Sequence, residues 1–284
     1  MQKITYANAN GDTLETSRCF PYMLQNLTGI GAPTATNLTQ RGFQQDGENF
    51  FGSLLEPRII GFNLWIRGSS RTDLLDKRQD VMKVFNSKLG EGTLTYENEN
   101  GSWQIAASVV DGPGDNSAAL GNPLVQNYRI SLYCPDPAWE GVVENGARLI
   151  GFKGGFTLPF EMPFKLGSQG DTRVFDYSGT LDAPLRIEFR GPAVMPKIVK
   201  GETDETIEVE VELLSGDKLF VETKPYDIDI YTISAAGVRE SAFNYVKADS
   251  EYFQLTRGEN TLSFFAASGD PEAYIYWRDR YVGV

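Results

Sequence analysis

The residues of this sequence whose types and spacing could do chemistry are mostly carboxylates. The segment Ile207–Leu213 alternates apolar and acidic residues, so an extended strand would place Glu208, Glu210 and Glu212 on one face. A row of carboxylates could bind calcium, which takes several oxygen ligands. The same row could be a solvated outer face that discourages edge-to-edge pairing of strands. Because no loop has the spacing of a calcium-binding loop, we favour the solvated face.

Two other acidic groups have a simpler interpretation as turns. Asp227 and Asp229 would lie on the same side of an extended segment, and paired acids can hydrolyse glycosides when they flank a sugar. Catalytic pairs usually come from different elements, so we assign these two to a turn and a strand start. The run Asp111-Gly-Pro-Gly-Asp115-Asn116 could be a metal loop, but turn chemistry accounts for it.

The residues needed for several common catalytic and binding motifs are missing from the sequence. The 284 residues include no histidine, which excludes Ser-His-Asp and Cys-His catalysis and the usual zinc sites. The glycines form no phosphate loop or dinucleotide fingerprint, and the weak run at Gly151–Gly155 lies among strands. Cys19 and Cys134 match no paired metal or redox spacing, so we expect free thiols. We therefore expect no catalytic, cofactor-binding or metal-binding residue and no enzyme.

Aromatic residues crowd the segment Tyr274–Tyr281. If it is a strand, its two faces carry alternating sets of residues, namely Tyr274, Tyr276 and Arg278 on one and Ile275, Trp277 and Asp279 on the other. Exposed Tyr and Trp could stack on sugars or on a protein partner. Core packing with cross-strand pairs explains most of such a pattern.

Composition bounds the class of protein. A chain of 31.5 kDa predicts two domains. The net charge of −12 repels phosphate backbones and anionic lipid, so nucleic acid is not an expected specific partner. The N-terminal segment lacks the apolar core of a signal peptide, and no stretch is apolar enough to span a bilayer. We expect a protein made in a reducing cytosol.

One helix is predicted, over residues 72–89, among segments that otherwise indicate strands. Ser and Thr precede it as N-cap candidates, Asp73 lies near its positive end and Lys88 near its negative end. Apolar residues recur at the helical period and form one stripe that must pack on a core. The other face carries Lys77, Arg78 and Lys83.

The strand-like segments fall into two groups. Before the two prolines of Cys134–Pro137 the clearest strands are at 57–67, 93–97, 103–110 and 128–134. After them the pattern is of short strands only, starting with 156–164, at the spacing of a β-sandwich. Because prolines remove ladder donors, we divide the chain into a β domain with one helix, 1–137, and a β-sandwich domain, 138–284.

Two sets of residues together carry a resemblance to a known family. The first set is Arg58–Phe62, Arg71–Arg78, Asn86–Leu94 and Leu132–Pro137. The second set is Leu255–Leu262 and Tyr274–Tyr281. Both sets resemble the distal tail proteins of long non-contractile-tailed phages, the siphophage tail-component family. The resemblance covers most of the chain in order.

The resemblance implies a structural tail-tip protein of the virion, assembled in the host cytoplasm. Its N-terminal β domain with one helix would close into a hexameric ring, with a C-terminal galectin-like β-sandwich on the outside. The ring would join the tail tube to the tail-associated hub and to receptor-binding or baseplate proteins, and DNA would pass through its lumen. The alternative is a glycan-binding β-sandwich tail protein that contributes to host adsorption, with a carboxylate hydrolase third.

Overall fold

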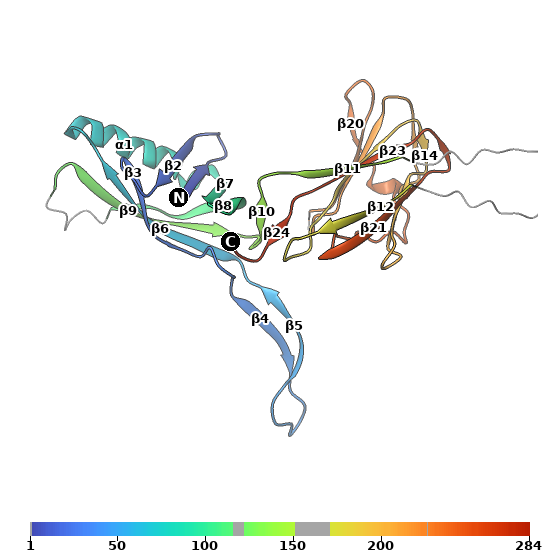
Figure 1. Cartoon of the computed structure of the whole chain (residues 1–284), viewed down its shortest axis with the longest axis horizontal. Helices are drawn as coiled ribbons and strands as arrows, with labels where there is room; N and C mark the ends of the chain where they lie inside the picture. Colours follow the sequence, from blue (N-terminus) through green and yellow to red (C-terminus); the bar gives the residue numbers. More distant parts are fainter. Residues whose placement is uncertain (1, 116–121, 151–170, 226) are drawn as a thin grey trace, which may run out of the picture. The chain divides into compact units, whose positions relative to one another are not determined.

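The computed structural model describes residues 2–115, 122–150, 171–225 and 227–284, and the chain folds into two compact units (Figure 1). The first unit comprises Met1–Val142 and the short segment Tyr281–Val284, and the second comprises Val143–Arg280. The strand expected at 156–164 and the glycines at 151–155 lie outside the described residues. We describe each unit by itself.

The main sheet of the first unit is closed into a barrel. Its strands are β1 Lys3–Ala7, β2 Thr13–Ser17, β3 Tyr22–Thr28, β6 Arg58–Arg67, β7 Glu91–Asn98, β8 Gly101–Asp115, β9 Val125–Cys134, β10 Trp139–Gly141 and β24 Arg280–Tyr281. Their order is β24-β10-β8-β7-β1-β2-β3-β6-β9, and β8 also pairs with β9, which brings the two sides of the sheet together. The loop predicted to begin at Asp111 begins later, because β8 continues to Asp115 through two register shifts against β9.

The barrel core follows from strand alternation. In β6 the residues Ile60, Phe62, Leu64 and Ile66 are buried, while the residues between them are more exposed. Strands β1, β7 and β9 of the same sheet contribute alternate residues to the same cluster. The period-2 pattern that predicted β6 is therefore the pattern of one face turned toward the core.

The predicted helix is shorter in the structure. Helix α1 covers Arg71–Val84, and a separate 3₁₀ turn, η1, covers Ser87–Leu89. Ser70 is the N-cap, and its hydroxyl accepts a hydrogen bond from the Asp73 amide at 3.1 Å. The helix ends where Phe85 turns into the core and stacks on Tyr6, with ring centroids 5.2 Å apart.

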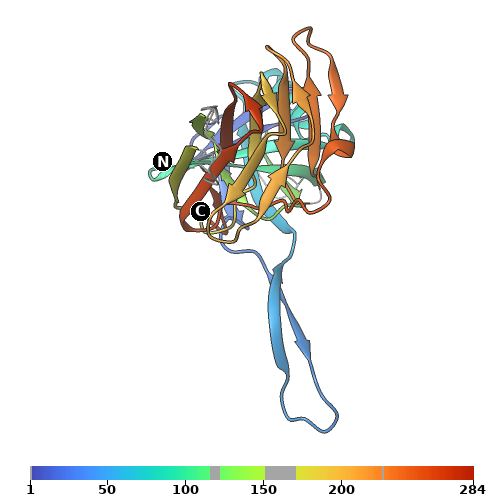
Figure 2. The same cartoon turned by 90° about the vertical axis from the view of Figure 1, so that its right-hand side faces the viewer.

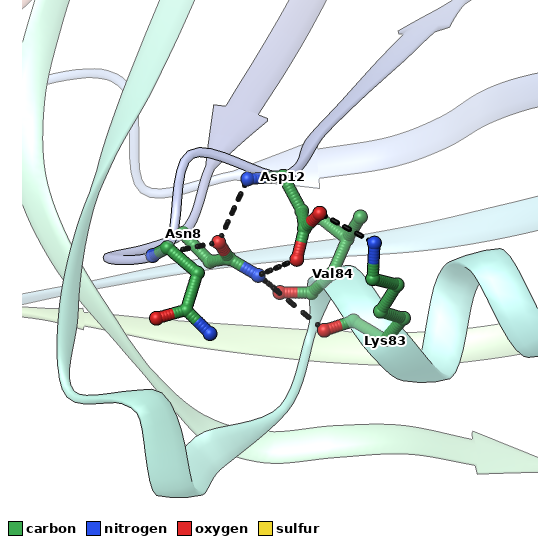
Figure 3. A network of polar contacts seen from close by, with 5 residues as sticks. Asn8, Asp12, Lys83 and Val84 are labelled. Atoms are coloured by element: carbon green, nitrogen blue, oxygen red, sulfur yellow. Dashed lines mark hydrogen bonds and ion pairs between the residues drawn. The ribbon is translucent and has the colours of Figure 1, made fainter.

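A buried asparagine holds the end of α1 against the β1–β2 turn (Figure 3). The side-chain oxygen of Asn8 accepts hydrogen bonds from the amides of Asn10 and Asp12, both at 3.0 Å. Its side-chain nitrogen donates to the carbonyls of Lys83 and Val84, both at 3.4 Å. Lys83 also pairs with Asp12 at 2.5 Å. These contacts satisfy carbonyls that the helix end leaves without partners.

The described residues of the second unit form three sheets. The six-stranded sheet is β11 Asn145–Ile150, β23 Glu272–Trp277, β13 Arg186–Arg190, β18 Lys218–Glu222, β19 Asp229–Ile233 and β20 Arg239–Ser241. The four-stranded sheet is β12 Asp171–Tyr177, β21 Gly258–Phe265, β15 Lys197–Lys200 and β16 Thr206–Glu208. A small sheet joins β17 Glu212–Leu213, β14 Ala193–Val194 and β22 Ser268–Gly269, and η3 covers Phe243–Tyr245.

The two larger sheets share one hydrophobic core. Ile187, Val221 and Ile275 come from the six-stranded sheet, and Ile198 and Phe264 come from the four-stranded sheet. The rings of Phe189 and Phe264 meet across the sheets at 5.4 Å. This is a β-sandwich, so the predicted fold class, mainly β with one helix and a galectin-like sandwich, is confirmed.

Candidate assembly interface

An exposed hairpin is the most unusual surface of the first unit. Strands β4 Ala35–Gln40 and β5 Asn49–Leu55 pair only with each other and extend away from the barrel (Figures 1 and 2). No residue of 31–57 belongs to the hydrophobic core of the unit. We call this element the hairpin arm.

The hairpin arm carries large apolar side chains in solvent. The exposed fractions are 45% for Leu38, 65% for Phe50, 67% for Phe51 and 58% for Leu54, and Phe43 in the connecting loop is 95% exposed. An isolated two-stranded hairpin is only marginally stable in water. Contiguous exposed apolar residues mark interaction sites. The arm therefore has the properties of an element that completes its packing on another molecule.

Apolar side chains lie on both faces of the arm, between polar ones. Thr36 lies opposite Leu54, and Leu38 lies opposite Gly52, so the two leucines share one face. On the other face Asn37 lies opposite Ser53, whose hydroxyl donates to the Asn37 side-chain oxygen at 2.7 Å. That face also carries Ala35 opposite Leu55 and Thr39 opposite Phe50, so both faces of the arm present exposed apolar side chains.

The acidic residues singled out in the sequence do not form one row. Glu208 lies in β16 and Glu212 in β17, which belong to different sheets, and Glu210 lies between these strands, so the single strand predicted over 207–213 is wrong. The break occurs where the Glu210 amide donates to the Tyr245 carbonyl at 2.7 Å, outside the ladder of β16. Glu208 pairs with Lys247 at 3.1 Å and Lys197 at 3.7 Å.

The other acidic pair also has local roles. The Asp227 amide closes a turn on the Lys224 carbonyl at 3.0 Å, and the Asp229 carboxylate pairs with Arg239 at 2.5 Å. Among the described residues, no group of three or more Cys, Asp or Glu side chains could hold a metal ion. No helix in the described part of the chain is long and apolar enough to cross a membrane.

The terminal aromatic residues form a cross-strand network on the six-stranded sheet. Tyr274 and Tyr276 in β23 are stacked on each other, with centroids 6.5 Å apart. The guanidinium group of Arg190 lies 4.0 Å from the Tyr274 ring centre, and that of Arg186 lies 4.4 Å from the Tyr276 ring centre. Trp277 packs edge-on against Phe175 at 5.4 Å. These rings contact charged and apolar neighbours of their own unit.

The carboxylate of Glu188 lies at the centre of that network. Its partners are Arg190 at 2.7 Å, Lys218 at 3.1 Å and the Tyr276 hydroxyl at 3.4 Å. Burial raises the pKa of Glu188, but hydrogen bonds from the two cations outweigh it, and the pKa is lowered overall.

Two of the basic residues predicted on the helix face, Lys77 and Lys83, form ion pairs within the unit. Lys77 pairs with Asp73 on the same helix, and Lys83 pairs with Asp12 of the β1–β2 turn. The two cysteines are unpaired thiols: Cys19 is exposed and Cys134 is buried, and burial raises the pKa of Cys134 to about 12.

The hairpin arm is the part of the candidate interface that the sequence patterns did not predict. The clearest strands predicted before Pro137 begin at residue 57, so none of them covers β4 or β5. An Asp-Gly pair between segments rich in Thr, Phe and Leu is a hairpin signal. Gly47 adopts φ of 79°, which favours glycine, so this signal could have located the arm.

Comparisons with known proteins place both units in one family. Residues 9–134 match the phage tail protein RIFT-related domain, and residues 178–281 match the siphovirus-type tail component, C-terminal domain. No curated protein matches the sequence. The chain is thus, by fold and by domain pair, a siphovirus-type tail component.

Solved structures agree with this class. SPP1 Dit, described as a paradigm of the hub adsorption apparatus in phages that infect Gram-positive hosts, is 14% identical, with a TM-score of 0.66 over 98% of both chains. A chain of the phage P2 baseplate in its activated conformation with Ca is 12% identical, with a TM-score of 0.57 over 100% of this chain and 99% of that chain. This protein belongs to the siphophage distal tail protein family.

Proposed function

We propose that this protein forms a hexameric ring at the tip of the phage tail and that the hairpin arm makes the contact between neighbouring subunits. The ring joins the tail tube to the tail-associated hub and to receptor-binding or baseplate proteins, and it has no enzymatic activity. We assign ring formation to the domain 1–137 and place the β-sandwich of 138–284 outside the ring. Assembly takes place in the host cytoplasm.

The observation that carries this proposal is the set of large apolar side chains that the hairpin arm exposes to solvent. A closed ring of identical subunits needs heterologous contacts, in which one patch of a subunit meets a different patch of its neighbour. An arm that extends from its own barrel supplies one such patch. Burial of an exposed leucine or phenylalanine contributes about 1.5–3 kcal/mol, so a few of these residues stabilise a specific contact.

The charge of the chain suits a channel for DNA. The formal net charge is −12, so phosphate groups that approach the protein are repelled rather than held. A ring with this charge would let DNA slide through its lumen without binding it. The proposal therefore includes passage of DNA and no specific recognition of nucleic acid.

Native mass spectrometry and light scattering of the purified chain test the ring. The expected mass is six times the 31.5 kDa of one chain. Leu54→Ser should weaken assembly, because it removes an exposed apolar side chain at no cost to the core. The expected rise in the dissociation constant of each contact is about 10- to 100-fold.

Asn37→Ser is the matched control, since Asn37 is an exposed polar residue of the same arm and its replacement removes no apolar side chain. It should assemble as the wild type does. A wild-type chain that stays monomeric at all concentrations, or equal loss of assembly in both variants, would contradict the proposal. A monomer that binds a glycan array would instead support the adsorption role.

A further inference from the structure

The base of the hairpin arm is held by a buried arginine. Arg58 begins β6, directly after the arm, and is 3% exposed. One terminal nitrogen, Nη1, donates to the carbonyls of Gly29 and Gly31 at 3.0 Å and 2.9 Å. These carbonyls belong to the segment that leads into the arm. Arg58 therefore ties together the two chain segments from which the arm extends.

The other terminal nitrogen of Arg58 binds a segment that comes much later in the chain. Nη2 donates to the carbonyl of Val282 at 2.7 Å. The planar guanidinium fork can bind several acceptors in fixed directions, and a lysine ammonium cannot reproduce this arrangement. The segment Tyr281–Val284 and the base of the arm thus share one buried side chain.

One carbonyl at the base of the arm, that of Ile30, accepts several hydrogen bonds. The carbonyl of Ile30 accepts from the indole nitrogen of Trp139 at 3.2 Å and from the amide of Val284 at 3.2 Å. Arg58 Nη1 lies 3.4 Å from the same oxygen. Trp139 is fully buried and lies 5.7 Å from the Arg58 guanidinium. The segment around Ile30 is therefore fixed from three directions.

Glycine permits the close approach of these segments. A side-chain carbon added at Gly283 would lie 2.9 Å from the Gly31 carbonyl carbon and 3.0 Å from the Ala32 amide. A side-chain carbon at Gly31 would meet nothing within 4 Å. The segment Tyr281–Val284 thus packs against the base of the arm, backbone to backbone, at a position where any larger residue forces a shift.

We propose that the segment Tyr281–Val284 is a clasp that fixes the direction in which the hairpin arm leaves the barrel, with Arg58 as the positioning residue. This inference rests on the proposed role of the arm in ring assembly. Because the clasp follows the whole second unit in the chain, the arm takes its direction only after that unit has been synthesised. The clasp therefore delays ring assembly until the second unit and the clasp have both been synthesised.

The size of the effect on ring assembly depends on the fraction of time that the arm points in the direction needed to contact the neighbouring subunit. The apparent dissociation constant of the contact between subunits is the intrinsic value divided by that fraction. If release of the clasp leaves the arm correctly directed about one tenth of the time, the apparent constant rises about tenfold. The arm contributes nothing to the buried core, but Tyr281 and Val284 of the clasp pack against it, so the unfolding midpoint is measured for every clasp variant.

Pulsed electron paramagnetic resonance between two spin labels measures the direction of the arm. One label is attached to the exposed native Cys19 of the first unit and the other to Thr39→Cys in the middle of the arm. All measurements use full-length chain with Leu54→Ser, so that subunit contacts do not align the arm. We expect one narrow distance distribution for this parent and a broad one for Arg58→Met and Gly283→Ala.

Two controls separate direction from folding. Gly31→Ala lies in the same cluster but in open space, so its distribution should stay narrow. Arg58→Lys keeps the charge and should give an intermediate width. Unfolding midpoints, measured in parallel, should show that Gly283→Ala remains folded. A narrow distribution for Arg58→Met and Gly283→Ala, or a broad one for the parent, would overturn the clasp.

Assembly of the same variants with Leu54 restored distinguishes failure of the clasp from failure of the proposed function. A broad distance distribution together with about tenfold weaker assembly supports both the clasp and the role of the arm in the subunit contact. A broad distance distribution with undiminished hexamer formation would support the clasp but overturn the role of the arm in the subunit contact. A narrow distance distribution for Arg58→Met and Gly283→Ala overturns the clasp whether or not these variants assemble.

Discussion

Substitution of Asn8 tests how the helix α1 is held on the barrel. Asn8 is 6% exposed, and its side chain accepts from two amides and donates to two carbonyls of the helix end (Figure 3). Asn8→Ala leaves these groups without their partner. Each lost hydrogen bond costs about 0.5–1.5 kcal/mol, and the two shorter ones dominate, so we expect a loss of about 2–3 kcal/mol in the free energy of unfolding.

Asn8→Asp is the sharper perturbation because it keeps the shape and both acceptors. It replaces the donor by a carboxylate oxygen that faces the Lys83 and Val84 carbonyls, at the negative end of α1. The ionised form is disfavoured in the folded state, so the pKa of the introduced carboxyl is raised above its unfolded value. The additional loss in the free energy of unfolding of Asn8→Asp, compared with Asn8→Ala, is therefore absent below about pH 4 and grows as the pH rises toward 7.

Urea unfolding followed by tryptophan fluorescence measures both effects. A Trp277→Phe background leaves Trp65, Trp103 and Trp139, all in the first unit. Hydrogen bonds from Lys83 and, at 3.5 Å, from Asn8 lower the pKa of Asp12, so substitution of Asn8 changes the titration of Asp12. The variants are therefore compared at each pH in an Asp12→Asn background. An Asn8→Asp protein as stable as the wild type at pH 7, or an Asn8→Ala loss under about 0.5 kcal/mol, would refute the proposed anchoring.

Three further predictions concern other contacts. The Asp73 carboxylate accepts a hydrogen bond from Lys77, and its pKa is lowered to about 2. The free energy of unfolding of the wild type should therefore fall as the pH drops from about 4 to 2. Urea titrations of Asp73→Asn should lack this part of the pH dependence. Cys19 should react at once with a thiol reagent and Cys134 only after unfolding, giving one thiol per native chain and two per unfolded chain by absorbance. Phe85→Ala should destabilise the first unit by about 3–5 kcal/mol in calorimetry or urea unfolding, because Phe85 is 2% exposed and stacks in the core; a change below about 1 kcal/mol would contradict that role.

The elements that the sequence predicted well are those with a strong local pattern. Strand β6 shows strict alternation because one face is buried, and α1 shows a helical stripe with a cap at Ser70. The helix end was placed too far along, since the inward turn of Phe85 depends on Tyr6 of a distant strand. Local periodicity does not record such a contact.

The candidate interface was harder to predict for a physical reason. The hairpin arm is exposed on both faces in one subunit, so its residues show little of the alternation that burial imposes. The acidic alternation at 207–213 was misleading in the opposite sense, since the chain bends between Glu208 and Glu212 while keeping apolar residues inward. Pairing of β8 with β9 depends on long-range closure that no short window of sequence contains.

The return of Tyr281–Val284 makes the second unit an insertion within the first. Its first and last long strands, β11 and β23, pair antiparallel from Asn145 opposite Trp277, so its entry and exit points lie side by side. Such a module can be exchanged as a cassette without opening the barrel that receives it. A recombination event would have to preserve both junctions at once, because a chain cut after Val142 would lose the strand that completes its host.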